Sequence, residues 1–306
     1  MQPAPAETRL PHISVCVCTY KRPDLLQRLL ARLGVQKTAD RFTYSIVVVD
    51  NDQSGSARQT GDAFASQSAI ALRYCIEPRQ NISLARNKAV ENAAGDFIAF
   101  IDDDEIPSEV WLLTLFDACR HYNVDGVLGP VLPQFDSAPP AWIVKGKFYQ
   151  RPSYPTGFVI DWPKGRTGNV LLKKQVFAAE PVPFRPEFLT GEDQDFFRRA
   201  IARGYVFVWC EEAMAHEVVP AIRWKRSFML KRALLRGATS VVHPTFGISE
   251  VAKSLLAVPA YTLMLPFALL LGQHRFVPLT VKLFDHLGRL LALVGIRPVK
   301  QAYVTE

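Results

Sequence analysis

Residues 81–107 have the sequence NISLARNKAVENAAGDFIAFIDDDEIP, and the order of structural elements in this segment indicates the class of fold. Residues 83–94 show helical spacing and stop before Gly95, a residue type that commonly follows the end of a helix. The short apolar run at residues 97–101 predicts a buried strand. That strand leads directly into the acidic residues 102–105, so the segment predicts a helix, a buried strand and a polar loop in succession.

The same alternation of strands and helices fills the chain upstream. We expect strands at residues 13–19, 44–49 and 71–76, and helices at residues 24–33 and 57–68. Strands that alternate with helices form right-handed βαβ units and a mostly parallel sheet. In such a sheet, ligands bind beyond the carboxyl ends of the strands. Polar residues gather at those ends, and this clustering is the first indication of a functional site.

The composition changes after residue 125. Residues 125–190 are rich in Pro, Gly and aromatic residues, which predicts loops and short strands that form a lid or a pocket wall. A helix is expected at residues 192–203, and a strand at residues 205–210. The expected organisation is a flexible tail at residues 1–11, a main α/β domain at residues 12–220 and a helical C-terminal region at residues 221–306.

The overall composition excludes several classes of protein. The 306-residue chain has 49% apolar and 21% charged residues, which argues against a disordered, collagen-like or disulfide-stapled protein. Its five cysteines are too scattered for a zinc site. Cys16 and Cys18 lie in a predicted buried strand, where we expect them to pack in the core. The first residues lack the apolar stretch of a signal peptide, so we expect a cytoplasmic protein.

Positive charge is concentrated at the C-terminal end. From residue 218 onward there are twelve Lys or Arg residues and three Asp or Glu residues. Residues 223–236 have the pattern of a basic amphipathic helix. Residues 254–274 contain no charged residue over 21 positions, and Pro259 and Pro266 are expected to interrupt this stretch. It would embed in a membrane from one side, dock on the main domain or span the bilayer. No nucleic-acid-binding fold accompanies the basic residues, so the expected partner is an anionic membrane surface.

The acidic run predicts a metal site. Three adjacent carboxylates repel one another unless they are solvated or bound to a metal. In an extended chain Asp102 and Asp104 point to the same side, so we expect them to face one cation. Oxygen ligands suit Mg²⁺ or Mn²⁺ shared with substrate phosphates, and the chain has no glycine-rich phosphate loop to hold phosphates instead. The alternative is a solvated acidic turn.

Four segments together resemble family 2 glycosyltransferases of the GT-A fold. They are ISVCVCTYKRP at 13–23, VVVDND at 47–52, the segment 81–107 quoted above and TGEDQDFFRRA at 190–200. The resemblance covers about residues 12–216. The C-terminal part is most similar to bacterial exopolysaccharide enzymes of the succinoglycan-biosynthesis type.

This resemblance implies a fold and an activity. The fold is Rossmann-like α/β, with a mostly parallel central sheet flanked by helices and a basic, apolar helical extension. The activity is metal-dependent inverting transfer of a hexose from a nucleotide-diphosphate sugar, most simply a UDP-sugar. The acceptor is a glycan or lipid-linked saccharide in bacterial surface or exopolysaccharide synthesis, at the inner face of the cell membrane.

The resemblance also implies donor-binding residues. Thr19 and Tyr20 match positions that line the nucleotide base and ribose, and Asp50 matches a carboxylate that contacts uracil or ribose. Arg86 matches a position near the nucleotide, with a helix-surface arginine as the alternative. Asp102 and Asp103 match part of the acidic DXD-type motif that binds the diphosphate and the metal.

The resemblance further implies residues that bind the metal ion and a residue that accepts the proton of the acceptor hydroxyl. Mn²⁺ or Mg²⁺ would be held by Asp102, Asp104 and His216, with an exposed loop histidine as the alternative for His216. Asp193 matches the catalytic base, although acids in the first turn of a helix also complement the helix dipole. The residues expected to contact the acceptor or to support the site are Glu192, Asp195 and Asn169.

Two other functions stay open at this stage. A nucleotidyltransferase acting on sugar phosphates also uses a Rossmann-like half and acidic metal ligands, but it would have a Gly-rich basic segment after the first strand. The sequence there is CTYKRPD instead. A non-catalytic membrane-associated protein of the same fold would have lost Asp193 or the acidic run, and this chain has both.

Overall fold

The computed structural model describes residues 9–178, 180–188 and 190–299. Most of the tail expected at residues 1–11 lies outside this range, and within it Arg9 forms an ion pair with Asp96. The chain divides into two compact units. Unit 1 comprises residues 1–131, 152–184 and 193–216, and unit 2 comprises residues 132–151, 185–192 and 217–306.

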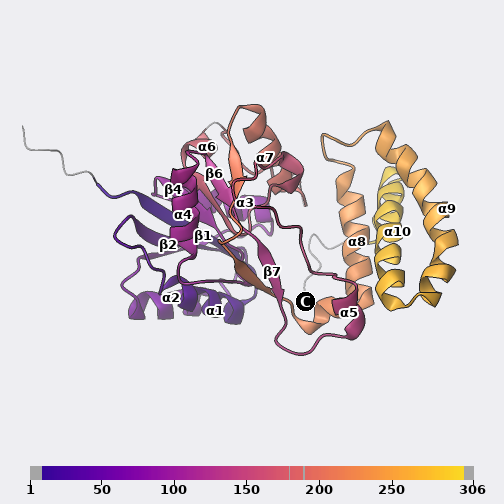
Figure 1. Ribbon diagram of the computed structural model, residues 1–306, viewed down its shortest axis with the longest axis horizontal. Coiled ribbons are helices and arrows are strands. Elements are labelled where there is room, and N and C mark those ends of the chain that lie inside the picture. The colour runs from indigo at the N-terminus through magenta and orange to yellow at the C-terminus, as the bar shows by residue number, and fades with distance from the viewer. Residues whose placement is uncertain (1–8, 179, 189, 300–306) are drawn as a thin grey trace, which may run out of the picture. The chain divides into compact units, whose positions relative to one another are not determined.

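Unit 1 is built on a seven-stranded sheet (Figure 1). Its strands, in the spatial order β3-β2-β1-β4-β8-β6-β9, are β3 (Leu72–Ile76), β2 (Thr43–Asp50), β1 (His12–Thr19), β4 (Phe97–Phe100), β8 (Val170–Lys173), β6 (Gly126–Leu128) and β9 (Phe207–Trp209). β8 is antiparallel to both of its neighbours, and the other pairings are parallel. The expected mostly parallel sheet is confirmed.

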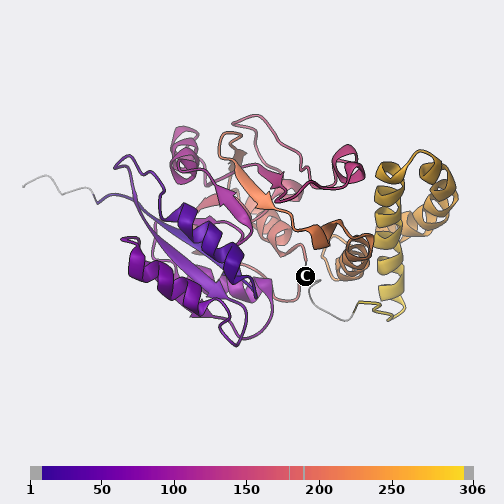
Figure 2. The same cartoon turned by 90° about the horizontal axis from the view of Figure 1, so that it is seen from below.

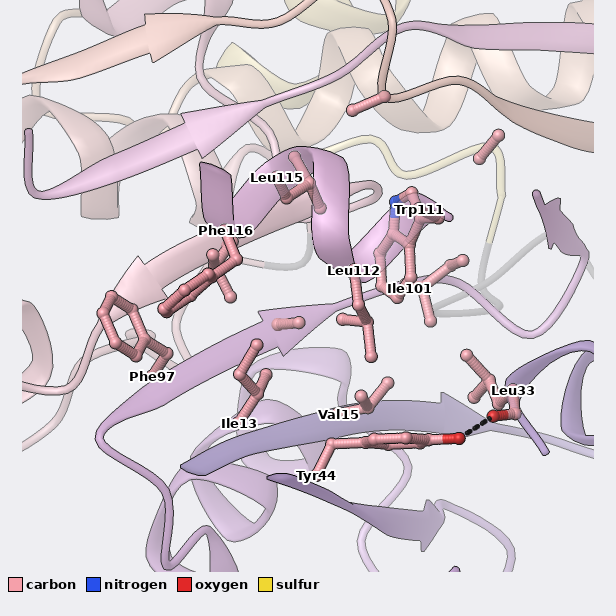
Figure 3. Packing of buried hydrophobic residues seen from close by; sticks show 14 of the residues in the cluster. Ile13, Val15, Leu33, Tyr44, Phe97, Ile101, Trp111, Leu112, Leu115 and Phe116 are labelled. Carbon is pink, nitrogen blue, oxygen red and sulfur yellow. Dashed lines mark hydrogen bonds between the residues drawn. The ribbon is translucent and has the colours of Figure 1, made fainter. Parts of the chain in front are cut away.

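Helices cover both faces of this sheet because its strands are apolar on both sides. The helices of this unit are α1 (Pro23–Leu33), α2 (Arg58–Gln67), α3 (Ile82–Asn92), α4 (Trp111–His121), α6 (Gln175–Ala178) and α7 (Glu192–Ala202). On one face Ile13 and Val15 pack in a cluster with residues of α1 and α4, including Trp111 and Phe116 (Figure 3). On the other face Cys16 packs in a cluster with residues of α3 and α7.

The buried cysteines behave as the sequence predicts. Cys16 is fully buried, and the partly buried Cys18 packs against the same cluster. Burial raises the pKa of the Cys18 thiol to about 12. Both side chains therefore stay protonated and fill the core.

The segment between residues 125 and 190 consists largely of loops and short strands, as expected. A second sheet of three short strands has the order β5-β10-β7. These strands are β5 (Glu105–Pro107), β7 (Val131–Gln134) and β10 (Ala215–Val218), and the short helical turns are α5 (Ala141–Lys145), η1 (Trp162–Lys164) and η2 (Ala221–Trp224).

Three long helices follow in unit 2: α8 (Arg226–Ser240), α9 (Ile248–Leu270) and α10 (Gln273–Leu293). They form the orange to yellow end of the chain in Figures 1 and 2. The expectation that Pro259 and Pro266 interrupt the apolar stretch is wrong, because α9 continues through both. Both proline rings are on exposed positions of the helix. The break comes instead at Gly272, whose φ of 104° turns the chain into α10.

Two glycines allow α8 and α10 to approach each other closely. A Cβ atom on Gly237 of α8 would overlap the carbonyl oxygen of Asp285, and one on Gly288 of α10 would overlap that of Leu234. In both cases the obstacle is backbone rather than a flexible side chain. The packing of these helices therefore depends on the absence of a side chain at both positions.

We expect Gly288→Ala to lower the free energy of unfolding by about 1–3 kcal/mol, because the added methyl group must force the two helices apart. Gly247→Ala is the matched control, since a Cβ there meets nothing within 4 Å. Urea denaturation followed by circular dichroism measures both. Equal stability of the two variants would contradict the close contact of α8 and α10.

Candidate active site

The candidate site lies at the carboxyl edge of the parallel strands in unit 1. Thr19 at the end of β1 is paired in register with Asp50 at the end of β2. The acidic run follows β4, which pairs with the other side of β1. The register of the sheet thus brings three segments that are far apart in the sequence to one edge.

The acidic run forms a turn rather than an extended strand. β4 ends at Phe100, and the amide of Glu105 donates a hydrogen bond to the carbonyl oxygen of Asp102 at 3.0 Å. The run is therefore not extended, and the alternation expected of an extended chain does not apply to Asp102 and Asp104. It is Asp103 and Asp104 that converge, because both accept hydrogen bonds from Nη1 of Arg22, at 3.2 and 3.3 Å.

Asp103 is a buried member of this group. Its side chain is 7% exposed, and its Oδ2 accepts a hydrogen bond from the Thr19 hydroxyl at 2.8 Å. Burial raises the pKa of Asp103, the Arg22 guanidinium opposes this rise, and Asp104 adds to it. Both oxygens of Asp103 are engaged within the protein, so its geometry favours fixing the turn over direct contact with a ligand.

Asp102 is the accessible carboxylate of the run, with 45% of its side chain exposed. Its Oδ1 lies 3.9 Å from Nη2 of Arg86, whose own side chain is 9% exposed and whose guanidinium lies over the ring of Phe184. The alternative that Arg86 is a helix-surface arginine is therefore wrong. The structure brings together two residues that the sequence proposed for the donor site.

Gly168 lies directly against the acidic turn. A Cβ atom at this position would be 2.8 Å from Oε1 of Glu105 and 3.0 Å from Oδ2 of Asp102. The neighbouring Thr167 is buried, and its hydroxyl has no hydrogen-bond partner within the described part of the chain. The loop before β8 thus packs closely against the acidic turn.

Asn169 supports this loop from within the protein. It is fully buried with φ of 54°, and its Oδ1 accepts a hydrogen bond from Nε1 of Trp111 at 2.7 Å. Its Nδ2 donates to the carbonyl oxygens of Pro130 and Ala213. The amide side chain therefore ties three loops together, which favours a supporting role over contact with an acceptor.

Asp50 is also occupied by contacts within the protein. It is fully buried, and its carboxylate accepts hydrogen bonds from the amides of Asp52 and Ala57 and from the Tyr74 hydroxyl. Burial and the bond to Asp50 raise the pKa of Tyr74. This geometry fixes the loop after β2. Tyr20, the other residue expected at the base, is half-buried beyond the end of β1.

The three acids at the start of α7 have different environments. Asp195 is fully buried and accepts hydrogen bonds from Arg198 and Arg199, each at 2.9 Å. Glu192 is buried as well. Asp193 is partly exposed, and its Oδ1 accepts a hydrogen bond from the amide of Gln194 at 2.8 Å. Of the three, Asp193 is the one whose carboxylate solvent can reach.

The structure does not show the proposed metal ligands gathered in one cluster within its described residues. His216 lies in β10 with an exposed side chain. Among residues 9–178, 180–188 and 190–299, no three His, Cys, Asp or Glu side chains are grouped closely enough to hold a metal. Mg²⁺ is commonly bound by one or two carboxylates together with substrate phosphates, and the partly exposed carboxylate of Asp102 fits that mode.

Two organising residues escaped prediction from the sequence. Arg22 belongs to the motif at residues 13–23, and it pairs with Asp103 and Asp104. Asn51 accepts a hydrogen bond from the amide of Asn81 and donates to the carbonyl oxygens of Glu77 and Arg79. Both follow strand ends in the quoted motifs, and that position was the available signal.

A mostly parallel α/β sheet with an acidic turn, an arginine and a closely packed loop at its carboxyl edge defines a GT-A protein. The model of Glycosyl transferase family 2 matches residues 14–169. The succinoglycan biosynthesis protein ExoM of Rhizobium meliloti (strain 1021) is 31% identical over 307 residues, which cover 95% of each chain. The chain therefore belongs to glycosyl transferase family 2.

Further relatives agree with this assignment. The glycosyltransferase AglE of Haloferax volcanii is 26% identical over 69% of this chain and 66% of its own length. The crystal structure of S. aureus TarS has a TM-score of 0.53 at 16% identity, covering 95% of this chain and 55% of that one. TarS 1–349 in complex with UDP-GlcNAc has a TM-score of 0.53 at 13% identity, covering 93% and 92%. At these identities the likeness to TarS shows the fold alone.

We expect Gly168→Ala to weaken binding of UDP in the presence of Mn²⁺ by about fivefold or more, because the new methyl group displaces the Asp102 and Glu105 carboxylates. Gly34→Ala is the control, since the nearest atom to its Cβ belongs to the flexible side chain of Phe64. Titration calorimetry measures both affinities. If Gly168→Ala folds normally and binds UDP with unchanged affinity, the loop before β8 is not part of the donor site.

Proposed function

We propose that the chain is a metal-dependent inverting glycosyltransferase that moves a hexose from a UDP-sugar to a glycan or lipid-linked acceptor. The observation that carries this proposal is the exposed Asp102 beside Arg86 and Gly168 at the carboxyl edge of the sheet. The relative in succinoglycan biosynthesis, which matches nearly the whole chain, supports a role in bacterial surface or exopolysaccharide synthesis. The donor is proposed by analogy with the UDP-GlcNAc complex of TarS.

Arg86 and Thr19 organise the donor side of this site. The Arg86 guanidinium is held by burial against Phe184 and stays next to Asp102, where it offers positive charge to a diphosphate. Thr19 orients Asp103 through its hydroxyl, and Tyr20 follows as the residue available to a base. Because these groups are fixed before the donor arrives, binding requires little reorganisation of the protein.

Asp102 is the first candidate to hold Mn²⁺ or Mg²⁺, with Asp104 and His216 as further ligands. When bound, the ion neutralises charge on the leaving nucleotide diphosphate. In the structure Asp104 is paired with Arg22, so this arginine balances the charge of the acidic turn. The exposed position of Asp102 leaves one carboxylate for the donor side while its neighbours fix the backbone.

Asp193 is proposed as the base that accepts the proton of the acceptor hydroxyl. The acceptor oxygen forms a bond to C1 of the sugar as the bond from C1 to the diphosphate oxygen breaks. The proton passes to the Asp193 carboxylate, and the nucleotide diphosphate leaves with the electron pair. Asp193 lies in the first turn of α7.

The C-terminal helices are proposed to bring the enzyme to the inner face of the cell membrane, where a lipid-linked acceptor would lie. Within the described residues, one helix is long and apolar enough to cross a membrane, namely α9. The concentration of Lys and Arg after residue 218 adds attraction to an anionic lipid surface. A cytoplasmic location follows from this arrangement, since nucleotide sugars would reach the site from that side.

We expect activity to require a divalent cation. An excess of chelator should abolish the release of UDP from the donor in the presence of an acceptor, and added Mn²⁺ or Mg²⁺ should restore it. Asp102→Ala should bind UDP more weakly in Mn²⁺ than the unmodified chain does, with little difference in chelator. Full activity in chelator would refute the metal-dependent part of the proposal.

We expect Asp193→Asn to lower turnover by about 10²–10⁴-fold, the usual contribution of a positioned base, while UDP affinity is retained. Asp24→Asn is the matched control, because Asp24 is likewise an acid in the first turn of a helix but is exposed on α1. Single-turnover assays with a radiolabelled donor separate chemistry from binding. Similar turnover in the two variants would mean that Asp193 is not the base and only complements the dipole of α7.

A further inference from the structure

The outermost helix of unit 2, α9, is not a core helix. Within α9, Ser254 and Ala268 are the buried residues, and almost none of its most apolar stretch is covered. α10 packs against both α8 and α9 (Figure 1). The side of α9 that faces away from α10 is therefore apolar and uncovered within the unit.

Four strongly exposed apolar residues of α9 form one stripe. Leu256 and Leu263 are each 73% exposed, Phe267 is 69% exposed and Leu270 is 85% exposed. Their spacing of seven, four and three residues places them on one face of an α-helix. The stripe runs from Leu256 to Leu270, which are about 21 Å apart along the axis.

The charges around this stripe indicate what covers it. No Asp, Glu, Lys or Arg occurs from Ser254 to His274, and exposed basic residues flank this stretch at Lys253 and Arg275. α10 adds the exposed Lys282. Two copies of this surface would bring like charges together, whereas an anionic lipid surface complements both the apolar stripe and its basic surroundings.

Length alone would permit α9 to span a bilayer, since 23 residues extend about 34 Å. Its attachment to α10 opposes a span. The Ser254 hydroxyl lies 3.0 Å from Nδ1 of His286 and accepts a hydrogen bond from Nη1 of Arg289 at 3.1 Å. A span by α9 would draw the adjacent α10, with Lys282, Asp285 and Arg289, into the hydrocarbon, where charged side chains are costly.

The two prolines lead to the same conclusion. Pro259 and Pro266 lack the amide that would bond to the carbonyl oxygens of Leu255 and Thr262, four residues earlier. In the hydrocarbon centre such carbonyls need a partner, whereas at the membrane interface water and headgroups reach them. Both prolines lie at exposed positions of α9, so at an interface water and headgroups can reach this part of the helix.

We propose that α9 lies in the plane of an anionic membrane, with its stripe in one leaflet and α10 on the aqueous side, and that it does not cross the bilayer. This deepens the membrane association in the proposed function and rests on it. The chain then binds its membrane from one side, and both ends of α9 stay at the same interface.

The first test is flotation of the full chain with vesicles of phosphatidylcholine containing 30% phosphatidylglycerol. The variant Leu263→Ser/Phe267→Ser/Leu270→Ser should lower the bound fraction by roughly tenfold or more, since it removes the apolar stripe from exposed positions without cutting into a core. Val144→Ser/Val159→Ser is the control, because these two valines are comparably exposed but lie outside α9 and α10. High salt should release part of the protein, and vesicles without phosphatidylglycerol should bind less of it.

The second test measures depth. Leu256→Cys, Leu263→Cys and Leu270→Cys are labelled with a fluorescent probe, and quenching by lipids with shallow or deep spin labels is compared, with the unmodified chain as background. An in-plane helix gives three equal and shallow positions. Gln273→Cys, at the exposed start of α10, should react with a membrane-impermeant maleimide added outside the vesicles.

The outcomes separate this inference from the proposed function. A deep position 263 between shallower neighbours, with position 273 protected, would show a span and overturn the in-plane arrangement. Absence of flotation, or association of two chains through the stripe in sedimentation experiments, would overturn lipid as its partner. In either case UDP binding at Asp102 is measured separately and is unaffected. Flotation by a chain without transferase activity would instead refute the catalytic proposal alone.

Discussion

The ion pairs of Arg22 with Asp103 and Asp104 are the constraint on which the site depends. Three consecutive aspartates at the end of a buried strand would repel one another, and burial would add to that cost. One guanidinium and the Thr19 hydroxyl offset the charge of two of them and close the turn. As a result Asp102 is the partly exposed carboxylate of the run, and it lies beside Arg86.

The site residues named from the resemblance divide into two groups by burial. Asp50, Asn169 and Asp195 are fully buried, and their polar atoms bond to the backbone or to arginines. Asp102 and Asp193 are partly exposed. A buried polar group holds its loop in place because leaving it unpaired would be costly. The first group therefore favours positioning, and the second favours contact with ligands.

The sequence predicted the parallel sheet well because its strands are short apolar runs that end abruptly in polar residues, as β4 does at Phe100. It did not predict that the acidic run is a turn, because alternation assumes an extended chain. The partner of that run, Arg22, lies some 80 positions away and is identified only by the register of β1 and β4. The sequence also did not predict that α9 continues through Pro259 and Pro266. Helix propensity disfavours proline inside a helix, but at exposed positions the loss of a backbone hydrogen bond is tolerated.

The distribution of charge separates two kinds of anionic partner. In unit 1 the arginines of the site are matched by carboxylates, as Arg22 is by Asp103 and Arg86 by Asp102. These two arginines are outnumbered by the three aspartates that they face, so this site does not account for the net charge of +7. The excess lies after residue 218, in the helices that also carry the uncovered apolar stripe of α9. A nucleotide diphosphate would explain the arginines of the site. It would not explain the long apolar stripe of α9, because it offers no apolar surface of that length. An extended anionic surface with an apolar interior explains both the charge and the stripe.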